Sequence, residues 1–318
     1  MTKYVLKRLL WMIPVAIGVA IVIFTILYFT PGDPAVMILG SSATFEDRQI
    51  LRESMGLNDP YIIQLARFLK DTFIKLDLGT SYFTGKAVTS EIATRLPYTF
   101  ILALGSMILS CVIGIPLGIT AAVNQNKLSD RISMLIALIG VSMPQFWIGL
   151  LLVLLFSVHL GILPPSGVGS WKHFVIPIIA TSLGGIATQA RLVRSSMLDV
   201  IRADYVTTAR AKGVSKFAAV YKHALPNALI PVITQVGTSF GKTLGGTIVI
   251  ESVFGIPGIG NYMISAVNNR DYPVVRGSVV FLAVTFSFIV LLVDIIYAYV
   301  DPRIKAQYEG KSRRRKNG

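Results

Sequence analysis

Long apolar runs alternate with shorter polar stretches along most of this chain, and their lengths predict how it folds. A helix needs about 20 mainly apolar residues to cross the roughly 30 Å hydrocarbon core of a membrane. Six runs meet or approach that length: Leu9–Phe29, Tyr98–Val123, Ile132–Leu160, Phe174–Ala190, Ala228–Ile250 and Val279–Val300. The pattern therefore predicts an all-α polytopic membrane protein with six transmembrane helices.

Two of these runs differ from the others. The fourth is the shortest, so its helix is expected to extend into the basic segment that follows it. The first run comes after Lys7 and Arg8, as in a secretory signal peptide. It is too long for the apolar part of such a peptide, and no A-x-A cleavage site follows it, so we interpret it as a membrane helix.

The runs divide the chain into four parts. Residues 1–30 hold the N-terminus and the first membrane helix, and residues 31–97 form a long extracytoplasmic loop. Residues 98–302 hold the other five membrane helices, and residues 303–318 form a basic cytoplasmic tail. A loop as long as the first one is expected to contain secondary structure of its own.

Two helices are predicted in that loop. The first opens at Thr44, with Asp47 three residues later, which is the spacing of a capping box. The second begins after Asp59 and Pro60, and its apolar positions form one stripe: Ile62, Ile63, Leu65, Phe68, Leu69, Phe73 and Ile74. Such a loop is expected to rest on the membrane surface or to contact an external partner.

Composition and charge agree with a membrane protein. Hydrophobic residues make up 53% of the chain, charged residues only 14%, and the mean hydropathy is +0.66. The net charge of +14 is not that of a nucleic-acid-binding protein, because 19 of the 30 Lys and Arg residues fall in segments on one side of a six-helix topology. The loop 31–97 on the other side carries 7 basic and 8 acidic residues. This is the positive-inside pattern, so both termini are expected in the cytoplasm.

Motifs for catalysis or metal binding are missing from the sequence. There is no GxxxxGK[ST] loop, and the GKT ending of Gly237–Thr243 has the wrong spacing and lies in an apolar run. His159, His173 and His223 are scattered, and the single Cys111 is expected to be a small packing residue. We therefore expect no catalytic residue, cofactor site or metal site in this chain.

The basic segment 191–226 has a composition of its own. It is long for a connection between membrane helices, and Ala209, Ala211 and Gly213 would allow a partner to approach the backbone closely. A loop that only keeps its charge in the cytoplasm, or a helix that lies on lipid, would not need small residues around one glycine. We therefore interpret the segment as a docking surface.

The same segment resembles the docking motif of inner-membrane permease subunits of bacterial ABC importers. That motif reads Glu-Ala-Ala, three residues, Gly, nine residues, Ile, one residue, Leu-Pro. With Gly213 as its glycine, Leu225 and Pro226 fall at the expected spacing. Three positions depart from the motif: Thr207, Thr208 and His223. The forms ARAKG and KHALPNALIP are similar to the peptide/nickel branch, whose members commonly lack the acidic residue.

The resemblance covers nearly the whole chain. It includes PGDP, GLNDP and LDLGTSY in the long loop, and VIESVFGIPGIGNYM, NNRDYPVV and DPRI towards the end. Together these stretches resemble the first of the two paired permeases in peptide importers. The resemblance implies the type I ABC importer permease fold in the inner membrane, with a translocation pathway for di- or oligopeptides.

The resemblance also implies partners and a coupling surface. A second, similar permease, two cytoplasmic ATPases that carry ATP and magnesium, and an extracytoplasmic solute-binding protein complete such a complex. A short helix, here expected over Tyr205–Phe217, docks on an ATPase and transmits its closure to the membrane helices. The residues expected at this contact are Tyr205, Thr208, Ala209, Arg210, Ala211, Lys212, Gly213, Val214, Phe217, Leu225 and Pro226.

Three ionisable residues in or beside the predicted membrane helices are further candidates, because charges there are costly and are often functional. Lys242 is expected to face the translocation cavity, since a cation that faces lipid would be unfavourable. For Glu251, a structural role at the end of its helix and contact with substrate both stay open. Asp294 is expected to pair within the bundle, with Lys242 as a candidate partner.

Two other functions are weighed against this interpretation. An ion-coupled secondary transporter is expected to show self-similar halves with interrupted helices, and none is visible in the sequence. An intramembrane enzyme would need a nucleophile beside a base. Within the importer interpretation, nickel, glutathione and sugars stay open beside peptides, as does the identity of the second permease.

Overall fold

The chain was analysed as a computed structural model that describes residues 2–40 and 42–300, so the predicted tail 303–318 lies outside the described residues. The described residues form helices and turns with one isolated bridge and no strand, which confirms the all-α class. The α-helices are α1 (Thr2–Phe29), α2 (Pro34–Leu39), α3 (Phe45–Ser54), α4 (Tyr61–Phe73), α5 (Val88–Val123), α6 (Leu128–Ser142), α7 (Gln145–Val153), α8 (Lys172–Ile201), α9 (Asp204–Ala211), α10 (Lys216–Ala218), α11 (Leu225–Ala228), α12 (Ile230–Gly246), α13 (Ile248–Val253), α14 (Ile259–Asn268) and α15 (Tyr272–Val300). Two π-helical turns, Leu154–His159 and Ala219–Ala224, follow α7 and α10.

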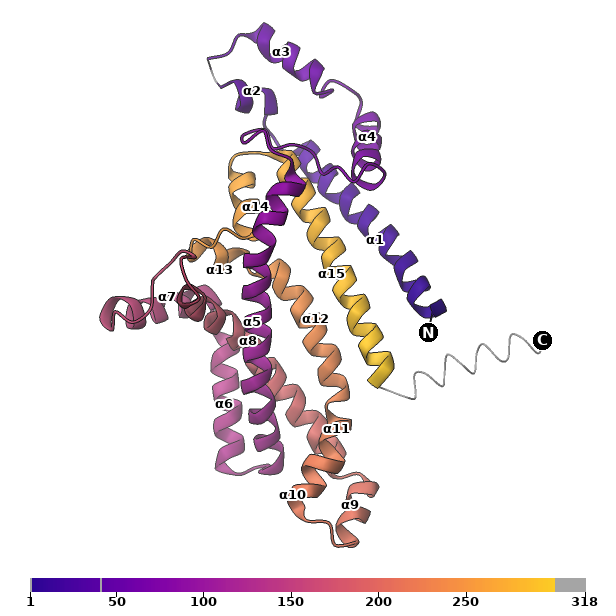
Figure 1. The fold of residues 1–318 in the computed structure, drawn as a ribbon, viewed down its shortest axis with the longest axis vertical. Coiled ribbons are helices and arrows are strands. Elements are labelled where there is room, and N and C mark those ends of the chain that lie inside the picture. The colour runs from indigo at the N-terminus through magenta and orange to yellow at the C-terminus, as the bar shows by residue number, and fades with distance from the viewer. Residues whose placement is uncertain (1, 41, 301–318) are drawn as a thin grey trace, which may run out of the picture.

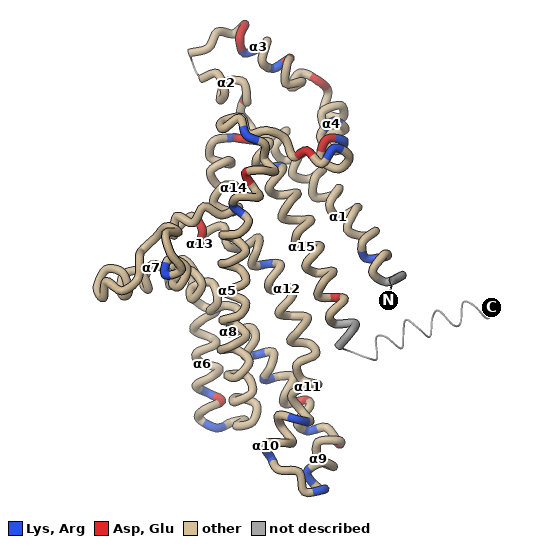
Figure 2. Tube along the Cα trace, viewed as in Figure 1, with Lys and Arg blue, Asp and Glu red and all other residues tan. Residues whose placement is uncertain are grey.

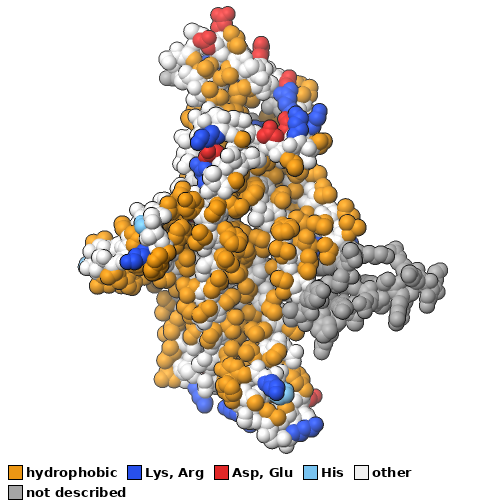
Figure 3. Space-filling model, viewed as in Figure 1, with side chains coloured by type: hydrophobic (Ala, Val, Ile, Leu, Met, Phe, Trp, Pro, Cys, Tyr) orange, Lys and Arg blue, Asp and Glu red, His pale blue; other side chains and the backbone are white. Residues whose placement is uncertain are grey.

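Figure 1 shows an elongated molecule with long helices between two differently built ends. At one end α2, α3 and α4 form a cap, and at the other end α9 and α10 form a foot. At the foot end Lys and Arg have few acidic residues beside them, whereas in and near the cap basic and acidic residues are mixed (Figure 2). Hydrophobic side chains cover most of the body between the two ends (Figure 3). This is the distribution expected of a helix bundle that crosses a membrane.

Four helices are long and apolar enough to cross a membrane alone: Val5–Phe29 in α1, α5, α8 and Tyr272–Ile296 in α15. The segments Leu128–Ser142 and Gln145–His159 are long and apolar enough to cross a membrane only when they are taken together, and the chain bends by 98° between them. The predicted membrane run Ile132–Leu160 is therefore divided into two helices that meet at a sharp bend. The cause is Pro144, whose ring disfavours helical backbone at Met143, and Met143 is extended with φ −101° and ψ 137°.

The fifth predicted run is also divided. Residues 228–250 extend from the end of α11 through α12 into α13, and the break falls at Thr247. With 17 residues α12 lies at the short end of what crosses a membrane. A sixth crossing therefore stays a prediction from the hydrophobic pattern.

Two helices extend beyond their predicted ends. The helix α5 begins at Val88, so residues 88–97 form its first turns and do not belong to an irregular loop. The helix α8 continues to Ile201, which confirms the expected extension into the basic segment. These extensions carry both helices past the apolar runs and give them polar ends.

The centre of the bundle is the contact between α5 and α8. A Cβ atom at Gly114 would lie 2.8 Å from the carbonyl oxygen of Ile186, and one at Gly118 would lie 2.6 Å from that of Ala190. Both distances are too short for carbon and oxygen, so only glycine allows this approach of the two backbones. Larger apolar residues then surround the foot end of this contact and form its buried core.

The cap follows the sequence prediction in its main features. Thr44 caps α3, and its side chain exchanges hydrogen bonds with Asp47 as a capping box. In the predicted stripe of α4, Phe68 is buried, and Leu65, Leu69 and Phe73 pack with it against Phe24, Ala20 and Val280 of the bundle. The stripe is narrower than predicted, because Ile62, Ile63 and Ile74 are exposed. The aromatic side of α4 therefore fastens the cap to α1 and α15.

Candidate functional site

The foot is a helix, a glycine turn and a second short helix. At the end of α9 the N–H of Gly213 donates to the carbonyl oxygen of Arg210 (3.0 Å), and that of Val214 donates to Ala209 (3.2 Å). These two bonds define a Schellman motif, in which the residue after the helix takes a positive φ. Gly213 has φ +90°, and a Cβ there would meet no atom within 4 Å. A side chain at this position would therefore be unfavourable because of the backbone conformation and not because of a clash.

This geometry corrects the prediction of one helix over Tyr205–Phe217. The chain leaves α9 at Gly213 and begins α10 at Lys216. Ser215 caps α10, because its hydroxyl accepts a hydrogen bond from the N–H of Ala218 (3.3 Å). The docking segment thus presents a turn at its outermost point and not the side of one helix.

A few apolar contacts and one hydrogen bond hold the foot against the bundle. Val206 of α9 is 2% exposed and packs in the buried cluster with Val193 and Met197 of α8. Val214 and Leu225 are partly buried against the same cluster. The Tyr205 hydroxyl accepts a hydrogen bond of 2.8 Å from the side chain of Asn227, which ties α9 to α11.

The remaining predicted contact residues are on the surface. Six of them are exposed at the turn and on either side of it: Thr208, Arg210, Ala211, Lys212, Gly213 and Pro226. Ala209 is half-buried. Phe217 is 71% exposed, and its ring lies against that of Tyr221, with 4.4 Å between their centroids. The foot therefore offers positive charge and an exposed aromatic pair to a partner. Tyr221 is a residue that the sequence analysis did not select.

An ion pair that the sequence analysis missed braces this end of the bundle. Arg194 of α8 donates two hydrogen bonds of 2.7 Å to the two carboxylate oxygens of Asp130 in α6. Asp130 also accepts the backbone N–H of Asn126 (2.9 Å), and only 5% of its side chain is exposed. The α5–α6 turn is thereby fixed to α8, the helix that leads into the foot.

Lys242 is exposed and lies at the edge of a polar cavity between helices of the bundle. The cavity has a volume of about 190 Å³ and lies between α5, α8 and α12. Its polar lining residues are Ser106, Ser110, Gln145, Thr181, Thr188, Gln189, Ser239, Lys242 and Thr243. The side-chain oxygen of Gln189 is buried and has no hydrogen-bond partner among the described residues. The cavity thus combines one cation with several hydroxyls and amides.

Glu251 lies elsewhere and has a different environment. It is fully buried, and its carboxylate accepts hydrogen bonds from Thr99 of α5 (2.8 Å), from Thr247 (2.9 Å) and from the N–H of Asn261 in α14 (3.0 Å). Thr99 in turn accepts the N–H of Ile259 (2.9 Å). Glu251 does not line the Lys242 cavity. Of the two roles left open for Glu251, these contacts support the structural one. Its carboxylate accepts a backbone N–H from the first turn of α14 and joins that helix to α5 through Thr99.

Asp294 does pair within the bundle, but its partner is Arg8 of α1 at 2.9 Å. The suggested pairing of Asp294 with Lys242 is therefore wrong. The physical reason is the packing of α1 directly along α15, which brings the two ends together. Asp294, like Glu251, is absent from the lining of the Lys242 cavity.

A bundle with a polar interior cavity and an exposed foot is the architecture of a membrane transport subunit, and comparison with known proteins identifies the family. The profile described as binding-protein-dependent transport system inner membrane component matches residues 114–306. The corresponding profile for the N-terminal part of such components matches residues 1–103. The chain belongs to this family of multi-pass inner-membrane components.

Relatives align along the entire chain. The glutathione transport system permease protein GsiC of Salmonella paratyphi A is 42% identical over 305 residues, which are 96% of this chain and 99% of that protein. The dipeptide transport system permease protein DppB of Alkalihalophilus pseudofirmus is also 42% identical, over 333 aligned positions that include 96% of this chain and all of that protein.

Solved structures with the same fold include the MetNI methionine ABC transporter in its inward-facing conformation. Its matched chain has a TM-score of 0.57 at 20% identity, and the match covers 66% of this chain and 96% of that chain. At this identity the likeness shows the fold alone. It confirms that the core of this chain has the fold of an ABC importer permease.

Proposed function

We propose that this chain is the permease subunit of an ATP-driven importer and forms, with a second similar permease, a translocation pathway for short peptides. The observation that carries this proposal is the 42% identity, over 96% of the chain, to permeases named for dipeptide and for glutathione transport. Glutathione is itself a short peptide, so both names point to one chemical class of substrate.

Energy comes from separate subunits in this proposal. Two ATPases bind ATP and magnesium in the cytoplasm, and one of them receives the foot of this chain. The exposed turn at Gly213, the basic residues around it and the Phe217–Tyr221 pair form the contact. Since α8 leads directly into α9, a displacement of the foot moves a central helix of the bundle.

The foot is cytoplasmic in this proposal, and the cap is extracytoplasmic, where a solute-binding protein delivers the substrate. The excess of Lys and Arg over acidic residues at the foot end, against a near balance in the cap, supports this orientation. A cysteine-labelling experiment tests it, after Cys111 has been replaced by alanine. Thr84→Cys in the exposed loop between α4 and α5 should react with an impermeant reagent added outside intact cells, and Lys127→Cys at the α5–α6 turn should not. The reverse result would contradict the orientation.

Lys242 is the proposed contact for substrate inside the pathway. Lys242 is the cation among the residues that line the polar cavity, where the carboxylate of a peptide would also find several hydrogen-bond donors. Glu251 and Asp294 have no such role in this proposal, because both are engaged in contacts between helices.

Uptake of labelled dipeptides, tripeptides and glutathione by cells that carry the complete transporter tests the substrate class. We expect uptake of at least one of these peptides, a loss on deletion of this chain, and a reduced rate for Lys242→Ala. Uptake of nickel or of a sugar in place of every peptide would contradict the proposal. A matched Lys127→Ala variant should transport normally, because this lysine lies outside the cavity.

A further inference from the structure

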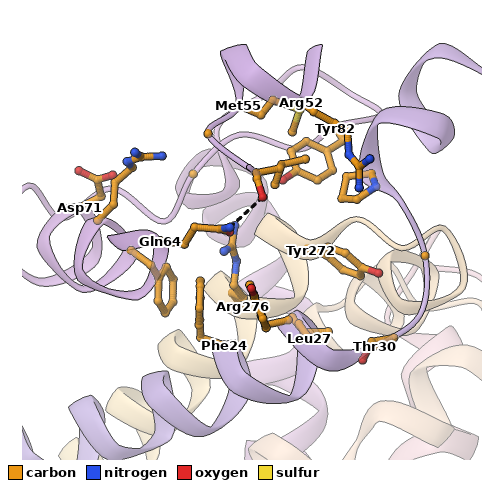
Figure 4. Close-up of a pocket in the computed structure, with 18 of the residues that line it drawn as sticks. Phe24, Leu27, Thr30, Arg52, Met55, Gln64, Asp71, Tyr82, Tyr272 and Arg276 are labelled. Atoms are coloured by element: carbon orange, nitrogen blue, oxygen red, sulfur yellow. Dashed lines mark hydrogen bonds between the residues drawn. The ribbon is translucent and has the colours of Figure 1, made fainter. Parts of the chain in front are cut away.

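A second and larger cavity lies beneath the cap. It is partly open, has a volume of about 370 Å³, and is lined by α4, by the segments before and after α4, and by the outer ends of α1 and α15 with the turn that follows α1. Figure 4 shows Arg276 of α15 reaching into the middle of this space, with Gln64, Tyr82 and Tyr272 around it. Lys242 and the polar cavity of the bundle are not part of it.

Arg276 is the unusual residue of this cavity. Its guanidinium carbon lies 5.0 Å from the ring centroid of Phe68 and 5.6 Å from that of Phe24. In the described part of the chain no carboxylate forms an ion pair with it, and its buried Nε has no hydrogen-bond partner. Aromatic faces stabilise a cation to a limited extent and do not accept its N–H groups in full. A buried cation without an acceptor is costly, so the site is suited to an anion.

The acids around the cavity do not supply that anion. Asp71 forms an ion pair with Lys75 at 2.8 Å, and Asp33 lies 3.5 Å from Arg52. Asp77 accepts a backbone N–H at 2.8 Å. Each of the three carboxylates that line the cavity therefore has a partner other than Arg276.

Two tyrosines add neutral donors. The hydroxyl of Tyr272 is buried and has no hydrogen-bond partner within the described residues, although it lines the cavity. Tyr82 lines it as well, and burial raises the pKa of its phenol above the usual value. Tyr82 therefore stays protonated at neutral pH, so that it can donate a hydrogen bond and does not neutralise Arg276.

We propose that this cavity binds a phosphate oxyanion, with Arg276 as its cation and Tyr272 and Tyr82 as further donors. The position of the cavity favours the headgroup of a phospholipid over free phosphate. Arg276 lies about one turn inside the outer end of α15, at the level where lipid headgroups meet a membrane helix. Tyr28, which lines the cavity, forms with Tyr61 an aromatic pair of the kind found at that level. A bound headgroup would fasten the cap to α1 and α15.

The test uses the assembled transporter, purified and stripped of lipid in a maltoside detergent that contains no phosphate. Phosphatidylglycerol and inorganic phosphate are titrated separately, and the thermal midpoint and the lipid retained in native mass spectrometry are measured. We expect phosphatidylglycerol to raise the midpoint of the wild type and to remain bound at one molecule per copy of this chain. In Arg276→Gln its apparent Kd should be about tenfold weaker or more, since charged hydrogen bonds are lost.

Two further variants control the experiment. Arg276→Lys keeps the charge but not the planar fork of donors, so it should bind with intermediate affinity, and it decides the question if Arg276→Gln does not fold. Arg67→Gln is the matched control, because Arg67 lines the same cavity but is paired with Asp59. It should bind like the wild type.

The outcomes separate the sources of the oxyanion. Binding of phosphatidylglycerol but not of inorganic phosphate identifies a lipid headgroup, and an Arg276-dependent shift with inorganic phosphate identifies a free phosphate. The proposal is overturned if neither ligand binds, or if both Arg276 variants bind as tightly as the wild type. Peptide transport by the wild type is measured separately, so that failure here and failure of the proposed function are distinguishable.

Discussion

The foot formed by α9 and α10 and the outer corner formed by α13 and α14 both contain residues that the sequence analysis selected, yet they use polar groups in opposite ways. In the corner, Glu251 is fully buried and its carboxylate accepts three hydrogen bonds from side chains and backbone. In the foot, the basic residues are exposed. Among the described residues 204–217, Val206 alone is buried.

The difference separates a structural site from the proposed docking site. The corner satisfies its own hydrogen-bond donors, so that a change there should affect folding. The foot satisfies the backbone at the end of α9 through the Schellman turn and leaves its basic side chains and Phe217 exposed, so a change at these exposed positions should affect binding to a partner. The predictions below run from the largest expected effect on stability to the smallest.

Glu251→Ala should have the largest effect. It leaves the hydroxyls of Thr99 and Thr247 and the N–H of Asn261 without their acceptor in a buried site. We expect a loss of about 3 kcal/mol or more in the free energy of unfolding. The thermal midpoint of the purified protein in detergent is the measurement. Glu251→Gln retains one acceptor oxygen and should lose less. Equal stability of wild type and Glu251→Ala would refute the structural role.

Asp130→Ala should rank second. It leaves Arg194 without its bidentate partner at the end of α8 that leads to the foot. We expect a loss of about 2 kcal/mol, because Arg194 retains some access to water and the full cost of an unpaired buried charge does not apply. Arg202→Ala is the control, since it removes only an exposed hydrogen bond to Gln125. A change in Tm no larger than that of the control would contradict a stabilising role for the Asp130–Arg194 ion pair.

Substitutions at Gly213 should have a smaller effect on stability and a larger one on docking. A residue with a Cβ is strained at φ +90° by about 1–2 kcal/mol, so Gly213→Val should distort the turn and reduce the yield of co-purified ATPase. Gly213→Ala is strained as well, although its methyl group would meet no other atom within 4 Å. Gly213→Asn should be the best tolerated, because asparagine accepts this conformation more readily. Equal ATPase yields from all three variants would place the contact elsewhere.

Phe217→Ala should leave stability almost unchanged. The ring is largely exposed and contacts mainly Tyr221, so its loss removes little buried surface from the isolated chain. Exposed aromatic residues often contribute much of the binding energy at an interface. We therefore expect a normal Tm together with a clear loss of co-purified ATPase. A normal yield of co-purified ATPase would show that Phe217 is not part of the contact with the ATPase.

The sequence predicted the local features of this molecule well, because their determinants are close together in the chain. The capping box of Thr44 and Asp47 depends on residues three positions apart, and the docking motif located Gly213 by its spacing. The turn itself also had a signal, since a glycine after a helix that ends in Arg210 and Lys212 is typical of a C-terminal cap.

The features that the sequence did not predict depend on distant residues. Thr99 lies 152 positions from Glu251, and Asp130 lies 64 positions from Arg194, so that only the packing of helices brings these groups together. Arg276 was not selected because it lies at the boundary between a predicted loop and the last apolar run. Its lack of a partner becomes visible only when the cap is placed over it.

The central claim is that transport through this chain is driven by ATPases that bind its foot. The direct measurement is uptake of a labelled dipeptide into proteoliposomes that contain this chain, the second permease, the ATPases and the binding protein. We predict uptake that requires ATP, ceases when the ATPases are left out, and falls sharply with Phe217→Ala although the bundle is intact. Uptake of the dipeptide without ATPases, driven by an ion gradient alone, would contradict the account.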